Sequence, residues 1–340
     1  MIEDREFLAE ERKQDDYAIR PDSFAEFVGQ QSLIENLEVF IEAASIRKES
    51  LDHCLFSGPP GLGKTSLARI IAETQGQRFH MLAAPNLRRP GDLVKILTAL
   101  EKMDVLFIDE IHRLPAPVEE TLYSAMEDRK ISITLADGLA AQIVQLDLPP
   151  FTLVGATTKI GSLSAPLRDR FGIKMQLEYY SDKELNIIIQ RACQKLNFFI
   201  ETDAVDAISS RSRRTPRVAI RLLKRIQDYA TVQKVGSKTS PVQRQDIEAY
   251  FDNLEIDQIG LTKLDLRFLD AMIEHFRDRP VGLKPLAAFL GEDIINLEEF
   301  IEPFLVQSGF IIRSERGRVL TQKALLHRGV KLETPGELFE

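Results

Sequence analysis

The fold is decided by the stretch Gly58-Pro59-Pro60-Gly61-Leu62-Gly63-Lys64-Thr65, which fits the phosphate-binding loop G-x-x-x-x-G-K-[ST] at every fixed position. The apolar residues 54–56 before it supply the strand that leads into such a loop. Glycines let the backbone approach phosphate oxygens, so that successive N–H groups and the N-terminus of the next helix converge on the anion. A plain turn has no use for the Lys-Thr pair. We therefore predict a site for a nucleoside triphosphate.

Individual residues of this loop have predicted tasks in binding ATP and Mg²⁺. Gly61 and Gly63 would bring the backbone close to the phosphates, and Lys64 would bridge the β- and γ-phosphates. Thr65 would offer its hydroxyl to Mg²⁺, a cation that prefers hard oxygen ligands and keeps several waters. Ser66, the next residue, is also predicted to bind the cofactor.

A second stretch, Val105-Leu106-Phe107-Ile108-Asp109-Glu110, predicts that the nucleotide is hydrolysed. Consecutive apolar residues are typical of a strand that is buried on both faces of a parallel sheet. Asp109 would then stand at the carboxyl end of that strand, beside the phosphate loop, and hold Mg²⁺ through its water shell. Glu110 would orient and partly deprotonate the attacking water. Without a phosphate loop, the same pair would be interpreted as solvated loop charge.

Composition limits the possible classes of protein. A chain of 340 residues exceeds one domain, and its net charge of −8 restricts any contact with nucleic acid to a local patch. Residues 1–16 carry mixed charges and fit neither a signal peptide nor a membrane anchor. Cys54 and Cys193 are too few for a disulfide scaffold or a zinc site. We expect a cytoplasmic protein without membrane contact.

Strands and helices alternate along the first half of the chain, which predicts an α/β fold with a doubly wound parallel sheet in a large domain at 1–180. The strands are predicted at 54–56, 79–83, 105–108 and 151–155, and the helices at 30–48, 65–74, 92–102 and 118–127.

An apolar insert at 131–148 interrupts this alternation. Its two apolar runs flank Asp137-Gly138 and predict a β-hairpin. One interpretation is an extra antiparallel edge packed on the core of the domain. The other is an exposed patch that binds a partner.

A family resemblance becomes specific after the fourth core strand. The words Gly155-Ala156-Thr157-Thr158 and Arg168-Asp169-Arg170-Phe171-Gly172 follow the phosphate loop and the Asp-Glu strand in a characteristic order. In this order the chain resembles the AAA+ family of ring-forming ATPases, and within it the motors that drive branch migration of four-way DNA junctions. The resemblance runs from about Ile19 to about Thr321.

The resemblance implies roles for residues that would say little alone. Thr158 matches the residue that senses the γ-phosphate. Arg170 matches the arginine finger that reaches a neighbouring subunit's nucleotide, a contact that contributes about 10³ to 10⁵ in rate. An isolated subunit should therefore hydrolyse ATP poorly. Without this context, Arg170 would be interpreted as a surface ion-pair residue.

Further positions match the nucleotide pocket of these motors. Ile19 and Arg20 precede Pro21, and Tyr180 is expected at the end of a fifth strand of the sheet. Helical patterns then predict a small lid domain at 181–254, with helices at 181–196, 203–210, 217–233 and 245–254. Within it, Arg217 matches a second sensor that touches nucleotide from the lid. A basic residue at a positive helix N-terminus also favours an anionic ligand nearby.

The third domain, 255–340, has the element order of a winged helix-turn-helix. Helices are predicted at 265–276, 285–290 and 297–308, followed by strands at 310–313 and 318–321. Glutamates at 298, 299 and 302 on the third helix would repel a phosphate backbone. The wing carries Arg313, Arg316 and Arg318, which suits contact with phosphates without reading of sequence. The resemblance assigns DNA contact to Arg313 and Arg318; otherwise a charged hairpin is commonly just solvated.

Together these observations predict an ATP-driven ring, a homohexamer, that moves duplex DNA through four-way junctions. The resemblance implies a junction-binding partner protein, whose contact we place at 131–148, and admits a junction resolvase as a further partner. Lys159 and residues 84–89 depart from the usual sequence pattern of the family, and neither belongs to the predicted catalytic residues. Two alternatives stay open: a nucleotide-gated regulator that reads an operator, and a protein-remodelling or clamp-loading ATPase.

Overall fold

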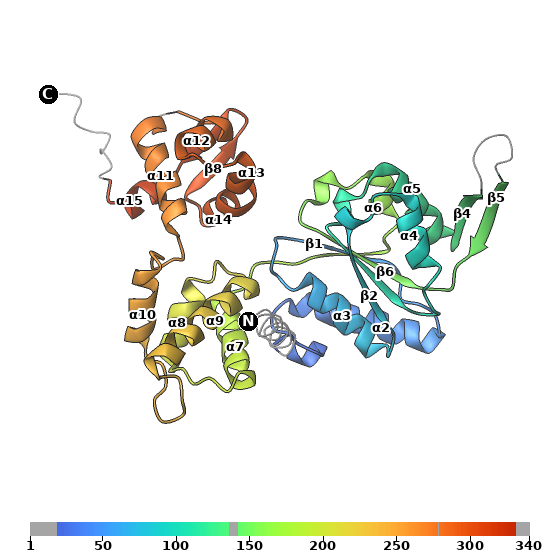
Figure 1. Ribbon diagram of the computed structural model, residues 1–340, viewed down its shortest axis with the longest axis horizontal. Helices are drawn as coiled ribbons and strands as arrows, with labels where there is room; N and C mark the ends of the chain where they lie inside the picture. Colours follow the sequence, from blue (N-terminus) through green and yellow to red (C-terminus); the bar gives the residue numbers. More distant parts are fainter. Residues whose placement is uncertain (1–18, 136–141, 278, 331–340) are drawn as a thin grey trace, which may run out of the picture. The chain divides into compact units, whose positions relative to one another are not determined.

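The structure, a computed structural model, describes residues 19–135, 142–277 and 279–330 (Figure 1). These residues form two compact units. The first comprises the described residues up to Phe198 together with Arg214–Arg221, and the second comprises Phe199–Arg213 and the described residues from Leu222 onward. Within the described ranges, no helix combines the length and the apolar character needed to cross a membrane.

A parallel five-stranded sheet forms the centre of the first unit, in the order β2-β3-β6-β1-β7. Its strands are β1 (Cys54–Ser57), β2 (Phe79–Ala83), β3 (Val105–Asp109), β6 (Thr152–Thr157) and β7 (Ile173–Gln176). All residues of β1 and β6 are buried, as expected for strands covered on both faces. The predicted doubly wound parallel sheet is confirmed. Its order brings the carboxyl ends of β1, β3 and β6 together at one edge.

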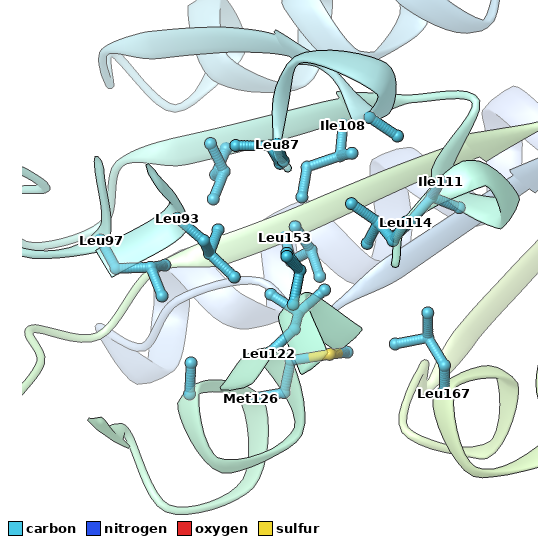
Figure 2. Packing of buried hydrophobic residues seen from close by; sticks show 14 of the residues in the cluster. Leu87, Leu93, Leu97, Ile108, Ile111, Leu114, Leu122, Met126, Leu153 and Leu167 are labelled. Atoms are coloured by element: carbon cyan, nitrogen blue, oxygen red, sulfur yellow. The ribbon is translucent and has the colours of Figure 1, made fainter. Parts of the chain in front are cut away.

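Helices cover both faces of this sheet. They are α2 (Gln31–Arg47), α3 (Lys64–Thr74), α4 (Pro90–Leu97), α5 (Ala116–Glu127) and α6 (Ala165–Asp169). A further helix, α7 (Asp182–Lys195), follows the last strand. Helices α4, α5 and α6 lie on one face and α2 and α3 on the other (Figure 1). Leu106, Ile108 and Leu153 pack against Leu93 and Leu122 in the core of the first face (Figure 2). Alternate residues along each strand supply the opposite face.

Helix α4 differs from the predicted span 92–102. It begins two residues earlier, because Pro90 suits a first helical position and the carboxylate of Asp92 accepts a hydrogen bond from the Arg89 N–H at 3.0 Å. It ends at Leu97, and the chain then turns toward β3. In that turn the buried carboxylate of Asp104 accepts the Glu101 N–H at 2.9 Å.

The predicted hairpin is formed by β4 (Lys130–Leu135) and β5 (Gln142–Asp147). Its base belongs to the core, because Ile131 and Leu148 are buried there and Leu146, which pairs with Ile131, packs against the same cluster. The Asp137-Gly138 turn lies outside the described residues. The base therefore packs on the core of the domain, as the first interpretation expects, but β4 and β5 form a separate two-stranded sheet and add no edge to the central one.

The second unit begins with helical elements. These are α8 (Thr202–Ser210), the part of α9 (Pro216–Gln233) from Leu222 onward, and α10 (Arg244–Asn253). The rest of the unit has winged-helix order: α11 (Lys263–Phe276), α12 (Leu283–Leu290), α13 (Ile294–Asn296), a π-helical turn (Leu297–Ile301), α14 (Glu302–Gln307), β8 (Ile311–Ser314), β9 (Gly317–Leu320) and α15 (Gln322–His327). Phe268, Leu286 and Phe310 are fully buried in its core.

The predicted third helix, 297–308, is interrupted. Pro303 lacks an N–H and cannot continue an α-helical ladder, and the turn just before α14 is π-helical. The interruption has a consequence for charge. Glu302, expected to face a DNA backbone, is fully buried, whereas Glu298 and Glu299 are exposed. The expectation of repulsion therefore applies only to the latter two residues.

Candidate functional site

The phosphate loop lies between β1 and α3 in a conformation that needs glycine. Gly61 and Gly63 have φ of +82° and +101°, a region that side chains disfavour. A Cβ at Gly61 would come within 2.7 Å of the Arg217 Cβ, and one at Gly63 within 3.0 Å of the Phe27 ring. The backbone therefore turns tightly here, at positions where a side chain would not fit. Such a cradle fits a phosphate group.

Lys64 is buried at the start of α3. Its ammonium donates hydrogen bonds to the carbonyl oxygens of Gly58 at 2.8 Å and Pro59 at 2.9 Å, which holds it inside the loop. Burial lowers the pKa of Lys64, and the carboxylates of Glu110 and Asp109 partly oppose that effect. Because its direct hydrogen-bond partners are neutral carbonyls, the side chain brings a positive charge to the loop. Thr65 and Ser66, both half-buried, follow on the first helical turn.

Two carboxylates stand at the same sheet edge. Asp109 ends β3, and burial, followed by the charge of Glu110, raises its pKa. Both conditions favour a cation beside it, so Asp109 and the Thr65 hydroxyl are the residues that fit Mg²⁺.

Glu110 and Thr158 are brought together by this edge. The Thr158 hydroxyl donates to Glu110 Oε2 at 2.9 Å, and His112 Nδ1 lies 3.2 Å from the same oxygen. The His112 ring also contacts Thr157 Oγ1 at 2.9 Å. The carboxylate is therefore oriented by Thr158, directly after β6, and by His112, in the turn after β3. A positioned carboxylate is suited to accept a proton from water.

Two other predicted pocket residues contact the phosphate loop directly. The Tyr180 hydroxyl donates to the Leu62 carbonyl at 3.2 Å, and burial raises the pKa of this phenol, which keeps it a neutral donor. Tyr180 lies beyond β7, directly before the N-cap Ser181. The Arg217 N–H donates to the Gly61 carbonyl at 3.3 Å.

Ile19 and Arg20 are half-buried and precede the loop by a long stretch of chain. Lys195 of α7 donates to the Arg20 carbonyl at 3.1 Å and to Glu26 at 3.0 Å. This ties the N-terminal segment to α7. Direct contact of Ile19 and Arg20 with nucleotide stays a prediction.

Arg170 is held within its own chain. Its guanidinium pairs with Glu127 at 2.9 Å, donates to the Pro166 carbonyl at 2.8 Å and lies 4.4 Å from the centre of the Tyr123 ring. The ion pair that the bare sequence suggested is therefore present. It does not test the role as a finger, because Glu127 is 56% exposed and such a pair contributes little free energy.

The wing arginines differ from one another in exposure and pairing. Arg318 donates to both oxygens of buried Glu302, at 2.6 and 2.9 Å, and Arg313 donates to Oε1 at 2.8 Å. Burial alone would raise the pKa of Glu302, but the hydrogen bonds from the two arginines outweigh it and lower the pKa. The Arg313 side chain is 54% exposed and that of Arg318 21%. Arg316, in the exposed turn, has no role in this cluster.

Sequence reasoning missed two residues of the nucleotide site. Phe27 packs its ring against Gly63, and His112 lies beside Glu110. The only signal for His112 was its position two residues after the acid. For Phe27 the sequence carried none, because its contact crosses a long stretch of chain.

Family models match nearly all of the described chain. The model described as "Holliday junction DNA helicase RuvB P-loop domain" matches residues 19–177, the RuvB AAA lid domain matches 180–257, and the RuvB C-terminal winged helix domain matches 258–328. The chain belongs to the RuvB family. The resemblance to AAA+ ATPases is thereby confirmed, and a RuvB P-loop domain implies that the chain binds nucleotide.

Named relatives agree with this assignment. The "Holliday junction branch migration complex subunit RuvB" of Neorickettsia sennetsu is 49% identical over 310 residues, which is 91% of this chain and 92% of that protein. The solved Thermotoga maritima RuvB Holliday junction branch migration motor is 46% identical, with a TM-score of 0.83 over 93% of this chain and 100% of its own. A T. maritima RuvB variant matches with a TM-score of 0.82 and the same identity and coverage.

Proposed function

We propose that this chain is an ATP-driven ring motor that translocates duplex DNA and drives branch migration of Holliday junctions in recombination and repair. The observation that carries the proposal is the presence, in one chain, of a nucleotide site with an oriented glutamate and a winged-helix region, both matched by RuvB models. A motor needs both parts, because hydrolysis in one must displace DNA held by the other.

In this proposal each residue at the sheet edge has a separate task. The loop backbone and Lys64 bind the phosphates of ATP, and Thr65 with Asp109 holds Mg²⁺. A cation held by these residues would offset negative charge on the phosphates. Glu110, oriented by Thr158, takes a proton from the attacking water. Thr158 can also sense the γ-phosphate and pass its presence to Glu110, because the Thr158 hydroxyl contacts that carboxylate.

We infer that the active form is a homohexameric ring. The support is Arg170, which directly follows α6 with a side chain 22% exposed and belongs to the stretch Arg168-Asp169-Arg170-Phe171-Gly172, which resembles the arginine-finger segment of AAA+ ATPases. For this role its guanidinium exchanges the exposed carboxylate of Glu127 for a neighbouring subunit's nucleotide. Both are anionic partners, so the exchange requires no desolvation of an unpaired charge.

The DNA contact is assigned to the wing. Arg313 keeps an exposed edge and Arg316 is exposed, so both can reach phosphates. Arg318 was assigned to DNA by resemblance, but its guanidinium donates hydrogen bonds to both oxygens of buried Glu302. We therefore give Arg318 the task of fixing the wing, with any DNA contact secondary to that.

The proposed partners are RuvA at the junction and RuvC as a resolvase. We place the RuvA contact on the hairpin 131–148, which extends from the sheet (Figure 1). Because Ile131 and Leu148 belong to the core, the contact is assigned to the part of the hairpin away from its base. A cytoplasmic location is part of the same proposal.

The deciding experiment measures ATP hydrolysis with no DNA, with duplex DNA and with RuvA plus a synthetic four-way junction, and then scores dissociation of that junction. We expect DNA and RuvA to raise hydrolysis and the junction to be dissociated only with ATP. Glu110→Gln is the matched control, because it should bind ATP and DNA without dissociating the junction. A wild-type protein that hydrolyses ATP yet leaves junctions intact under all conditions would contradict the proposal.

Two alternatives predict different outcomes. A nucleotide-gated regulator would protect one defined sequence in a footprint. Exposed Glu298 and Glu299, in the π-helical turn of the predicted reading helix, argue against such a contact. A protein-remodelling or clamp-loading ATPase would be stimulated by a protein partner without DNA.

A further inference from the structure

The turn between α8 and α9 contains two consecutive residues in left-handed backbone conformation that are not glycine. Arg213 has φ of 50° and Arg214 has φ of 56°. Side chains disfavour this region, so the surrounding structure must hold the turn in place. The boundary between the two compact units falls at the peptide that joins these residues. Adjacent residues of one tight turn therefore belong to different units.

On one side the turn contacts the nucleotide site. Arg214 Nε donates to the Tyr180 carbonyl at 3.1 Å, and the Tyr180 N–H donates to the Arg214 carbonyl at 3.0 Å. Tyr180 itself bonds to the phosphate loop at Leu62. Arg217, on the first turn of α9, bonds to Gly61. Short chains of hydrogen bonds therefore link the phosphate loop to this turn, so that a movement of the loop would displace the turn.

On the other side the turn contacts the winged-helix region. The Arg213 guanidinium pairs with Asp265 of α11, which is fully buried. Arg213 Nε donates to the Gly260 carbonyl at 3.1 Å, and its guanidinium lies 4.5 Å from the centre of the Phe304 ring. Arg213 thus joins the turn between α8 and α9, here called the lid turn, to α11, to α14 and to the segment that precedes them.

Backbone packing reinforces this attachment. Gly260 has φ of +87°, and a Cβ there would collide with the Arg211 carbonyl. The segment before α11 therefore lies directly on the lid turn. Asp265 in turn caps α11, because its carboxylate accepts the Thr262 N–H at 2.7 Å. One carboxylate receives both the cap of α11 and the Arg213 guanidinium.

We propose that Arg213 is a positioning residue that couples the nucleotide site to the DNA-binding region. This coupling role rests on the proposed function, and Arg213 is the residue through which ATP hydrolysis would be transmitted to DNA. Arg213 touches neither nucleotide nor DNA in this role. Its planar fork fixes the orientation of α11 relative to the lid turn, because the carboxylate, the carbonyl and the aromatic face each constrain a different direction.

The test compares Arg213→Lys with Arg213→Ala in the full-length protein. Lysine keeps a positive charge beside buried Asp265, so the fold is retained. It loses the second donor and the stacking on Phe304, so the orientation of α11 relative to the lid turn is no longer fixed. The control is Arg225→Lys, because Arg225 is exposed on α9 and pairs with Asp228 at 3.1 Å. Four quantities are measured: basal ATP hydrolysis, duplex DNA affinity, stimulation of hydrolysis by DNA, and junctions dissociated per ATP consumed.

We expect Arg213→Lys to keep basal hydrolysis and DNA affinity but to lose about 5- to 150-fold in junctions dissociated per ATP, the range of typical coupling free energies. The DNA stimulation should fall in parallel, and Arg225→Lys should behave as wild type. If Arg213→Ala unfolds the winged-helix region, Arg213→Lys decides alone.

Normal coupling in both Arg213 variants would overturn the inference, and so would a loss of DNA affinity that accounts for the whole defect. A wild-type protein that responds to neither DNA nor junctions would overturn the proposed function and this inference together. A responsive wild type with equally responsive variants overturns this inference alone.

Discussion

The phosphate loop and the wing both present cations, but they neutralise them differently. Lys64 donates its hydrogen bonds to two neutral backbone carbonyls, whereas Arg318 is paired directly with a buried carboxylate. Carbonyl dipoles stabilise an ammonium without cancelling its field, so Lys64 can still attract phosphate groups. The single carboxylate of Glu302 offsets one of the two positive charges that Arg313 and Arg318 bring to it. Equal residue charge therefore does not mean equal attraction for an anion.

Arg170 is an intermediate case between these two regions. Its carboxylate partner, Glu127, is largely exposed, unlike Glu302 of the wing. Water screens an exposed pair, which leaves the guanidinium able to change partners. The following predictions test whether the pairing of each cation decides its role.

The largest effect is expected for Arg170→Ala, which should lower hydrolysis by the assembled ring about 10³-fold or more. Glu110→Gln should be similarly inactive. Mixed rings of the two variants should recover some hydrolysis where an intact Arg170 faces an intact Glu110, measured as ATP turnover against mixing ratio. Co-assembled rings without recovery would show that Arg170 does not act across the interface.

Lys64→Ala should weaken ATP binding about 10- to 100-fold, because a hydrogen bond to a charged group contributes about 1.5–3 kcal/mol. Glu110→Gln provides the matched comparison, since it should retain ATP affinity while losing hydrolysis. Binding is measured by titration with a fluorescent ATP analogue. Equal affinities for the two variants would contradict the different tasks assigned to the cation and the acid.

In the wing, Arg316→Ala and Arg318→Ala should separate DNA binding from folding. Arg316→Ala should reduce the salt dependence of duplex binding by about 0.9 in slope, alike for all sequences, without changing stability. Arg318→Ala should destabilise the winged region by about 1.5–3 kcal/mol, because it removes charged hydrogen bonds to Glu302. Salt titration of duplex binding checks Arg316→Ala, and thermal unfolding checks Arg318→Ala. The reverse pattern would place the phosphate contact on Arg318.

The smallest effect concerns pH. Because the folded pKa of Glu302 lies below its ordinary value of 4.5, its pairing stabilises the fold above that pH and is lost as pH falls through the lower folded value. Glu302→Gln should therefore lower stability at neutral pH and flatten the acid limb of the melting temperature. An unchanged acid limb would mean that other carboxylates dominate acid unfolding.

The nucleotide site could be predicted in most of its parts because its residues act through short-range rules. The phosphate loop is one contiguous segment, and β3 places Asp109 at the sheet edge wherever the buried strand runs parallel to β1 and β6. The strand periods and most helix ends followed from local patterns. The end of α4 did not, because it depends on where the chain must turn next. Pro303 was a local signal for the interruption beside α14, and the helix predicted across 297–308 overlooked it.

Pairings between distant residues could not be predicted. Nothing local to Glu302 distinguishes it from Glu298 and Glu299; only the π-helical turn and the packing of the wing bury it. The same holds for Arg213 with Asp265 and for Phe27 against Gly63.

The sequence by itself determined the chemistry of this protein, since backbone and side-chain groups a few residues apart must meet in any strand-loop-helix unit that carries them. Tertiary structure alone decided which charges remain available. Whether a cation keeps its field depends on the carboxylates, carbonyls and water that long-range packing brings to it, and in the described parts of this chain that packing left Lys64 with carbonyls and gave Arg318 to Glu302.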